Sequence, residues 1–142
     1  MTEEQKDLKD LLIRDLCARL PYGVKVSTPD DVSRTITRMN IDRNLIEVGN
    51  YIDDVYVLSD IKPYLFPLSS MTEEHIFEIN NILGKDFEID KYGITDLIRN
   101  RRTCLSYLEL DALFEYFNKY HFDYRGLIPM GLANDCTNLN IY

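Results

Sequence analysis

The chain has 142 residues with 24 acidic and 16 basic side chains, and its formal net charge is −8 at pH 7. This length is typical of one domain, so we expect a single domain over residues 1–142 that folds without a metal or a disulfide framework. The negative charge argues against direct binding of nucleic acid, because attraction to phosphates requires a cationic surface.

Cysteine usage and the N-terminus predict a cytoplasmic protein without a membrane segment. Cys17, Cys104 and Cys136 are odd in number and far apart, which fits a reducing compartment. The first ten residues, MTEEQKDLKD, are acidic and polar, unlike a signal peptide, and no apolar run approaches the length of a membrane span. We expect neither a metal nor a cofactor, because only two histidines are present and no glycine-rich phosphate loop occurs.

The first predicted element is a helix. Thr2 and Gln5 have the spacing of a capping box, in which each side chain satisfies a free amide of the first turn. An apolar stripe follows at steps of three and four residues, formed by Leu8, Leu11, Leu12, Leu16 and Leu20. Pro21 ends the helix, because the residue before a proline avoids the helical conformation.

Four short strands are predicted next, in residues 24–26, 33–40, 45–48 and 55–59. Each is rich in β-branched or alternating apolar residues, and turn-forming residues separate them. This spacing predicts a four-stranded antiparallel meander, for which a strongly curled, SH3-like sheet is a plausible form. The N-terminal helix is expected to cover one of its faces.

The second half is predicted to be mainly helical. Pro63 and Pro67 mark an extended segment that links the sheet to a helix starting after Thr72 and ending at Gly84. Residues 86–94 could form a short hairpin. A last helix begins at the Ser106 and Glu109 capping box and ends near Tyr120. The fold class is therefore α+β: an N-terminal helix, the antiparallel sheet, two main helices and an extended C-terminal segment.

The stretch HFDYRG, residues 121–126, contains the only candidate reactive group. If it is extended, His121, Asp123 and Arg125 share one face, because side chains alternate along a strand. These three could form a small active site with His121 as a general base and Arg125 as an anion-binding group. The interpretation we favour is structural, with Asp123 and Arg125 paired to fasten the C-terminal segment to the body.

Two other groups of residues are candidates for surface contacts. Arg99, Arg101 and Arg102 form the one basic cluster and could contact an anion or an acidic partner, although neutralising a neighbouring acidic surface is the simpler interpretation. Four aromatic residues, whose type suits protein interfaces, are candidates for a partner surface: Tyr56, Tyr64, Phe66 and Tyr116.

Three segments carry a resemblance to a known group of proteins. These are LCARLPYGVKV (16–26), IKPYLFPLSSMTEE (61–74) and the C-terminal part (121–142), with HFDYRGLIPMGLA and a closing LNIY. They resemble a widespread family, with no assigned activity, from Bacteroides-type bacteria, their prophages and their phages. The resemblance implies a phage or mobile-element setting, and for a phage protein the host cytoplasm. It implies no mechanism.

Three functions fit these observations. The first is a non-enzymatic accessory protein that binds a protein partner through aromatic residues. The second is an acidic inhibitor or mimic that acts on a nucleic-acid-handling host protein. The third is a small enzyme centred on His121, Asp123 and Arg125. We favour the first, because no nucleophile motif accompanies the histidine.

Overall fold

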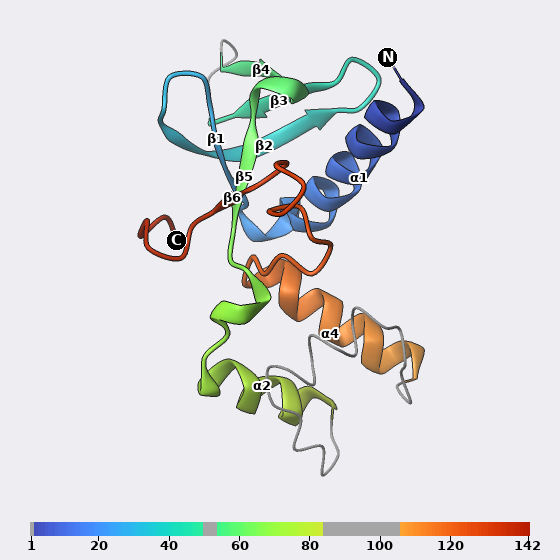
Figure 1. The fold of residues 1–142 in the computed structure, drawn as a ribbon, viewed down its shortest axis with the longest axis vertical. Helices are drawn as coiled ribbons and strands as arrows, with labels where there is room; N and C mark the ends of the chain where they lie inside the picture. The colour runs from blue at the N-terminus through green and yellow to red at the C-terminus, as the bar shows by residue number, and fades with distance from the viewer. Residues whose placement is uncertain (1, 50–53, 84–105) are drawn as a thin grey trace.

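A computed structural model describes residues 2–49, 54–83 and 106–142, and it has an α+β fold (Figure 1). The predicted hairpin at 86–94, Cys104 and the basic cluster Arg99, Arg101 and Arg102 lie outside these residues. No helix in the described parts of the chain is both long enough and apolar enough to cross a membrane.

Helix α1, Glu3–Arg19, confirms the predicted N-terminal helix. Thr2 accepts a hydrogen bond from the Gln5 amide at 3.2 Å, and the Gln5 side chain accepts one from the Thr2 amide at 3.0 Å. A short 3-10 helix, η1 (Leu20–Tyr22), contains Pro21 and ends at Gly23, whose φ of 69° is accessible to glycine at little cost.

Strands β1 (Lys25–Ser27), β2 (Ser33–Asn40), β3 (Leu45–Val48) and β4 (Val55–Val57) pair antiparallel in the predicted order. The turns between them place Asp31 and Asn44 at φ values of 60° and 54°, a conformation that these residue types tolerate well. The register between β2 and β3 shifts between Ile36 and Arg38. A short 3-10 helix, η2 (Leu58–Asp60), follows β4.

The sheet is larger than the four strands predicted, and it is mixed. Strand β5, Lys62–Leu65, pairs antiparallel with β1, and strand β6, Asn134–Asp135, pairs parallel with β5. The order is β4-β3-β2-β1-β5-β6, which leaves the sheet open. The segment with Pro63 and Pro67 was expected to be an extended link to the next helix, and it also supplies β5, in which Pro63 lies opposite Val26 of β1.

Two helices follow, as predicted. After η3, Leu68–Ser70, helix α2 spans Glu73–Leu83 and helix α4 spans Tyr107–Lys119. At the start of α2, the His75 amide donates to the Thr72 hydroxyl while the Thr72 amide donates to His75 Nδ1 at 3.0 Å. At the start of α4, the Glu109 amide donates to Ser106 Oγ, which confirms the predicted cap.

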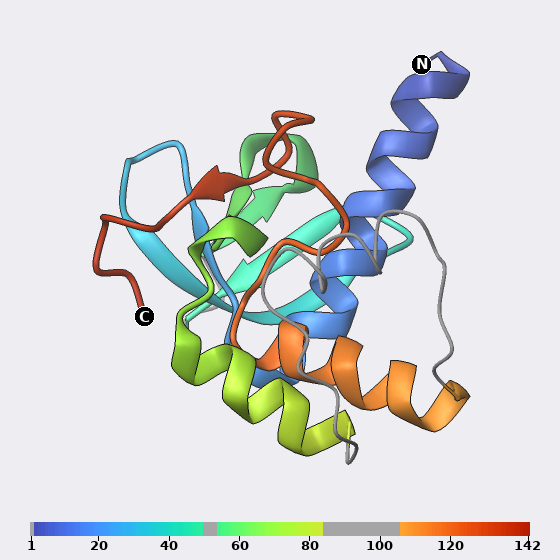
Figure 2. The same cartoon turned by 60° about the horizontal axis from the view of Figure 1, so that its bottom comes forward.

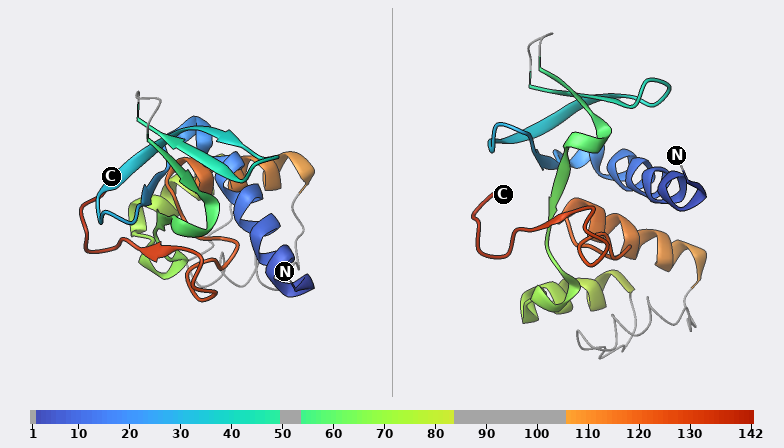
Figure 3. Two further views of the ribbon diagram at one scale, coloured as in Figure 1. Left: turned by 90° about the horizontal axis from the view of Figure 1, so that it is seen from above. Right: turned by 45° about the horizontal axis from the view of Figure 1, so that its top comes forward.

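Two hydrophobic clusters lie at opposite ends of the molecule. One is between α1 and the sheet and includes Leu16, Val26 and Leu65; the other is between α2 and α4 and includes Ile79 and Phe117. The sheet and α1 lie at one end and the α2–α4 pair at the other (Figure 2), and the segment after α4 lies largely between them (Figure 1; Figure 3, right). The groups that join the two clusters are therefore important for the fold.

Candidate functional site

The residues predicted as a reactive trio do not converge. His121 has a φ of 63°, so the segment is not extended at this residue and its side chain leaves the expected shared face. Asp123 accepts from two backbone amides, and Arg125 pairs with Asp15 on α1. The expected Asp123–Arg125 pair is therefore not formed, although Arg125 does bind the C-terminal segment to the body through another carboxylate.

The carboxylate that Arg125 contacts belongs to a buried cluster that the sequence analysis did not identify. We call Asp15, Arg19, Tyr124 and Arg125 the Arg19 cluster. The side chains of Asp15 and Arg19 are fully buried, and Arg19 Nε and Nη2 donate to the two Asp15 oxygens at 2.9 and 3.1 Å. Arg125 Nη1 donates to Asp15 Oδ1 at 2.8 Å. One carboxylate thus holds two guanidinium groups.

Arg19 also joins the two halves of the molecule. Its Nη1 donates to the Phe117 carbonyl at 3.3 Å, and its Nη2 donates to the Phe122 carbonyl at 2.7 Å. These carbonyls lie in the last turn of α4 and just beyond the helix, where a cation is favoured by the helix dipole. The Tyr124 ring lies 5.5 Å from the Arg19 guanidinium and 4.6 Å from that of Arg125. These contacts satisfy nearly all of the N–H donors of the buried Arg19 guanidinium.

Asp123 has a local structural role. It is 6% exposed, and its two oxygens accept from the amides of Leu127 and Ile128 at 2.8 and 2.9 Å. The carboxylate therefore satisfies two backbone donors in a turn that contains Gly126, whose φ is 77°. Leu127, fully buried in the sheet cluster, is positioned by this turn.

His121 is enclosed beneath an aromatic ring. It is 6% exposed, and its ring stacks on Tyr142 at a centroid distance of 3.8 Å. Its buried Nδ1 has no hydrogen-bond partner among the residues that the structure describes. The Tyr142 hydroxyl donates to the Tyr64 carbonyl and accepts from the Lys25 amide, so it bridges β1 and β5. Burial lowers the pKa of His121 to about 4, with smaller contributions from the Arg19 and Lys25 charges. The imidazole is therefore neutral at pH 7.

This burial predicts a pH dependence of stability. The unfolded chain binds a proton at His121 near the ordinary pKa of 6.5, whereas the folded chain does so only near 4. Stability is therefore lost as the pH falls through this window and is unaffected above it. Between pH 7 and 4 the wild type should lose about 2–3 kcal/mol of its free energy of unfolding through this one group. The His121→Asn variant should not show this loss, and asparagine tolerates the positive φ at this position.

Urea unfolding of both proteins at several pH values, followed by circular dichroism, measures the difference. Parallel pH profiles for the wild type and His121→Asn would contradict the assignment of a neutral, enclosed histidine.

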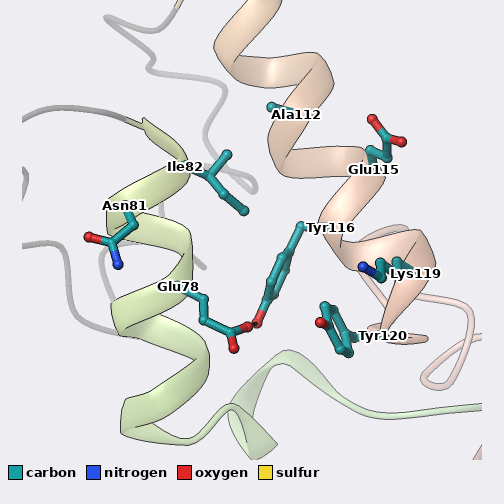
Figure 4. A pocket seen from close by; sticks show the side chains of 8 residues that line it. All are labelled: Glu78, Asn81, Ile82, Ala112, Glu115, Tyr116, Lys119 and Tyr120. Atoms are coloured by element: carbon teal, nitrogen blue, oxygen red, sulfur yellow. Dashed lines mark hydrogen bonds between the residues drawn. The ribbon is translucent and has the colours of Figure 1, made fainter.

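Away from these residues, the part of the chain that the structure describes has an accessible concavity between α2 and α4 (Figure 4). This α2–α4 groove has a volume of about 490 Å³. Ile82 and the Tyr116 ring lie between the two helices, and Tyr120 lies at one end (Figure 4). The residues that line the groove are Glu78, Asn81, Ile82, Ala112, Glu115, Tyr116, Lys119 and Tyr120.

Tyrosine hydroxyls orient the two carboxylates of the groove. The Tyr116 hydroxyl donates to Glu78 Oε2 at 2.6 Å, and burial together with Glu78 raises the pKa of Tyr116. The Tyr22 hydroxyl, from η1, donates to Glu115 Oε1 at 2.9 Å. In Figure 4 the Glu78 carboxylate points toward Tyr116, whereas Glu115 lies on the outer side of α4. Both carboxylates line the groove, and Glu78 is the one that lies between the two helices.

The four aromatic residues predicted to form a partner surface do not lie together. Tyr116, predicted to belong to this exposed surface, is covered by α2 and is only 6% exposed. Tyr56 packs against the sheet cluster and Phe66 against the helix cluster, and both are only partly buried. Tyr64 is half-buried in β5. Of the four, only Tyr116 lines the groove.

Other candidate chemistry is limited in the residues that the structure describes. Within them, no group of three or more histidine, cysteine or acidic side chains could hold a metal ion. Cys17 is exposed and Cys136 is buried, and both are free thiols. Burial is the main cause that raises the pKa of Cys136 to about 11, so this thiol is not an activated nucleophile.

The sequence did contain a signal for the Arg19 cluster. Leu8, Leu12, Asp15 and Arg19 follow one another at steps of four, three and four, which places the two ionic residues on the apolar face of α1. A charged pair at i and i+4 on such a face indicates a buried ion pair.

Comparison of the chain with protein-family models, with curated proteins and with solved structures found no match.

Proposed function

We propose that the chain is a non-enzymatic protein-binding module that contacts its partner through the α2–α4 groove. The observation that carries this proposal is the exposure of large apolar side chains on these two helices. Exposed fractions are 66% for Phe77, 42% for Ile82, 92% for Tyr107 and 83% for Leu108. Clustered apolar side chains with a polar rim are a mark of protein interaction sites.

Helical spacing connects these side chains to the groove. Phe77 lies one turn before Asn81 on α2, and Leu108 lies one turn before Ala112 on α4, so each continues a face that lines the groove. Tyr120 adds an aromatic ring that is 37% exposed, at the end of the groove near the start of α2. The groove and its apolar margins together offer anchor positions for side chains of a partner.

The contacts of the C-terminal segment support a binding role for the protein rather than a catalytic one. His121 is enclosed by Tyr142, while Asp123 and Arg125 are engaged with backbone amides and with Asp15. All three have the surroundings of structural residues. With the resemblance described above, these features favour an accessory protein of a phage or mobile element that acts in the host cytoplasm.

Site-specific photocrosslinking tests this proposal. Benzoylphenylalanine placed at Asn81, in the groove, should yield a discrete crosslinked protein in the cells that carry the gene. The same group at Arg38, on β2 at the far end of the molecule and 82% exposed, serves as the matched control. Excess wild-type protein should compete for the crosslink, and the Ile82→Glu variant should not. Equal crosslinks from both positions, or none from Asn81, would reject the groove as the binding surface.

A further inference from the structure

The helices that form the groove carry an excess of negative charge. Helices α2 and α4 contain six carboxylates and one ammonium group, a net charge of −5, while the whole chain has −8. The carboxylates are Glu73, Glu74 and Glu78 on α2 and Glu109, Asp111 and Glu115 on α4. A partner surface of positive charge is therefore favoured here, both for affinity and for the rate of encounter.

Lys119 is the one basic residue among the described residues that line the groove. The Lys119 ammonium lies 5.4 Å from the centre of the Tyr120 ring, and it forms no salt bridge with a carboxylate in the described parts of the chain. Glu78 uses Oε2 to accept from Tyr116, and Oε1 has no hydrogen-bond partner there. The Tyr116 hydroxyl thus holds the Glu78 carboxylate in place through one of its two oxygens.

We infer that the α2–α4 groove binds a basic amphipathic helix of a protein partner. An apolar side chain of that helix contacts Ile82, Ala112 and Tyr116, and an arginine reaches Glu78. This inference rests on the proposed function and specifies the chemistry of its partner. Arginine suits the position, because a guanidinium can hydrogen-bond a carboxylate while its flat face contacts a tyrosine ring.

The dimensions of the groove favour a helix as the bound element. Helix α4 has 13 residues, which corresponds to a length of about 20 Å. Its groove-lining side chains recur at helical spacing, from Ala112 through Glu115 and Tyr116 to Lys119. An amphipathic helix of three to four turns placed along two such helices presents apolar residues every third or fourth position, which matches this spacing.

Defined peptides test the inference. Three capped helical peptides of about 14 residues share a leucine–alanine face and carry arginine, glutamine or glutamate at all polar positions. Binding is measured by chemical-shift changes of the ¹⁵N-labelled protein at two salt concentrations. The arginine peptide should shift resonances of α2 and α4, bind at least tenfold more tightly than the glutamine peptide, and weaken at high salt. The glutamate peptide should not bind.

Matched variants separate a specific contact from general attraction. Glu78→Gln keeps an acceptor for Tyr116 but removes the charge, and it should weaken binding of the arginine peptide about three- to tenfold, the effect of roughly one lost ion pair. Glu115→Gln should have a smaller effect, because Glu115 points away from α2 (Figure 4). Asp10→Asn, on the exposed side of α1, makes the same change in net charge and should leave binding unchanged.

The outcomes also distinguish the inference from the proposed function. Equal binding of the arginine and glutamine peptides, no binding of any peptide, or equal effects of Glu78→Gln and Asp10→Asn would overturn the inference. A crosslink from Asn81 to a second copy of this chain or to a protein segment without basic residues would do the same. In these cases the groove remains a binding surface if the Asn81 crosslink is retained. Loss of that crosslink rejects both.

Discussion

The Asp15→Asn variant should be less stable than the wild type by about 3–5 kcal/mol, because removal of one partner leaves a buried charge uncompensated. Arg19 is fully buried and pairs with Asp15 through two hydrogen bonds. Asparagine offers one oxygen and no charge, so Arg19 and Arg125 both lose their ionic partner. Since a domain of this size is stable by about 5–15 kcal/mol, much of the stability depends on this one carboxylate. Urea unfolding followed by far-ultraviolet circular dichroism measures the change.

Two further variants determine whether the charge is the cause. Asp10→Asn makes the same chemical change at an exposed position of the same helix and should alter stability by less than about 0.5 kcal/mol. The double variant Asp15→Leu with Arg19→Met should be more stable than Asp15→Leu alone, because both charges are then removed together. It should not reach the wild type, because the Phe117 and Phe122 carbonyls lose their donor. Equal stabilities of Asp15→Asn and Asp10→Asn would refute this role of the Arg19 cluster.

The Asp123→Ala variant should lose about 2–4 kcal/mol, since two charge-assisted hydrogen bonds to backbone amides disappear and the amides stay enclosed. The amides are those of Leu127 and Ile128, and Leu127 is fully buried beside the sheet. The loss should appear in the thermal midpoint and in the urea midpoint alike. Asp42→Ala, in the exposed turn between β2 and β3, is the matched control and should be close to the wild type.

This experiment also separates the structural interpretation of Asp123 from the enzymatic one. A carboxylate that only orients a catalytic histidine could be removed with little change in stability. Unchanged unfolding of Asp123→Ala would therefore contradict the structural role and favour a chemical role for HFDYRG.

Local signals in the sequence were sufficient to predict much of the fold. The capping residues Thr2, Thr72 and Ser106 mark the helix starts, because side-chain oxygens near free amides act over only three residues. The antiparallel order of β1 to β4 was also predictable, since short turns join consecutive strands. Each of these features depends on neighbours along the chain.

Features that depend on distant residues were not predicted. Strand β5 contains Pro63, which normally argues against a strand, and β6 has only two residues and acquires its partner from β5. The Arg125 side chain contacts Asp15, which is 110 residues away, instead of the nearby Asp123. Burial of Tyr116 requires α2, and no periodicity within α4 alone reveals that cover. In each case the local sequence is compatible with more than one structure, and contacts between residues far apart in the chain determine which one forms.

The large sequence separation between Arg19 and its hydrogen-bond acceptors has a consequence for the synthesis of the chain. The carbonyls that accept its hydrogen bonds belong to residues 98 and 103 positions later in the chain. At a translation rate of about 5–20 residues per second, the ribosome needs roughly 5–20 seconds to add them. Until then the emerging polypeptide has helix α1 without the acceptors for its cation and a sheet without its last strand. The hydrogen bonds that join α1 to the end of α4 can therefore form only after these later residues have been synthesised.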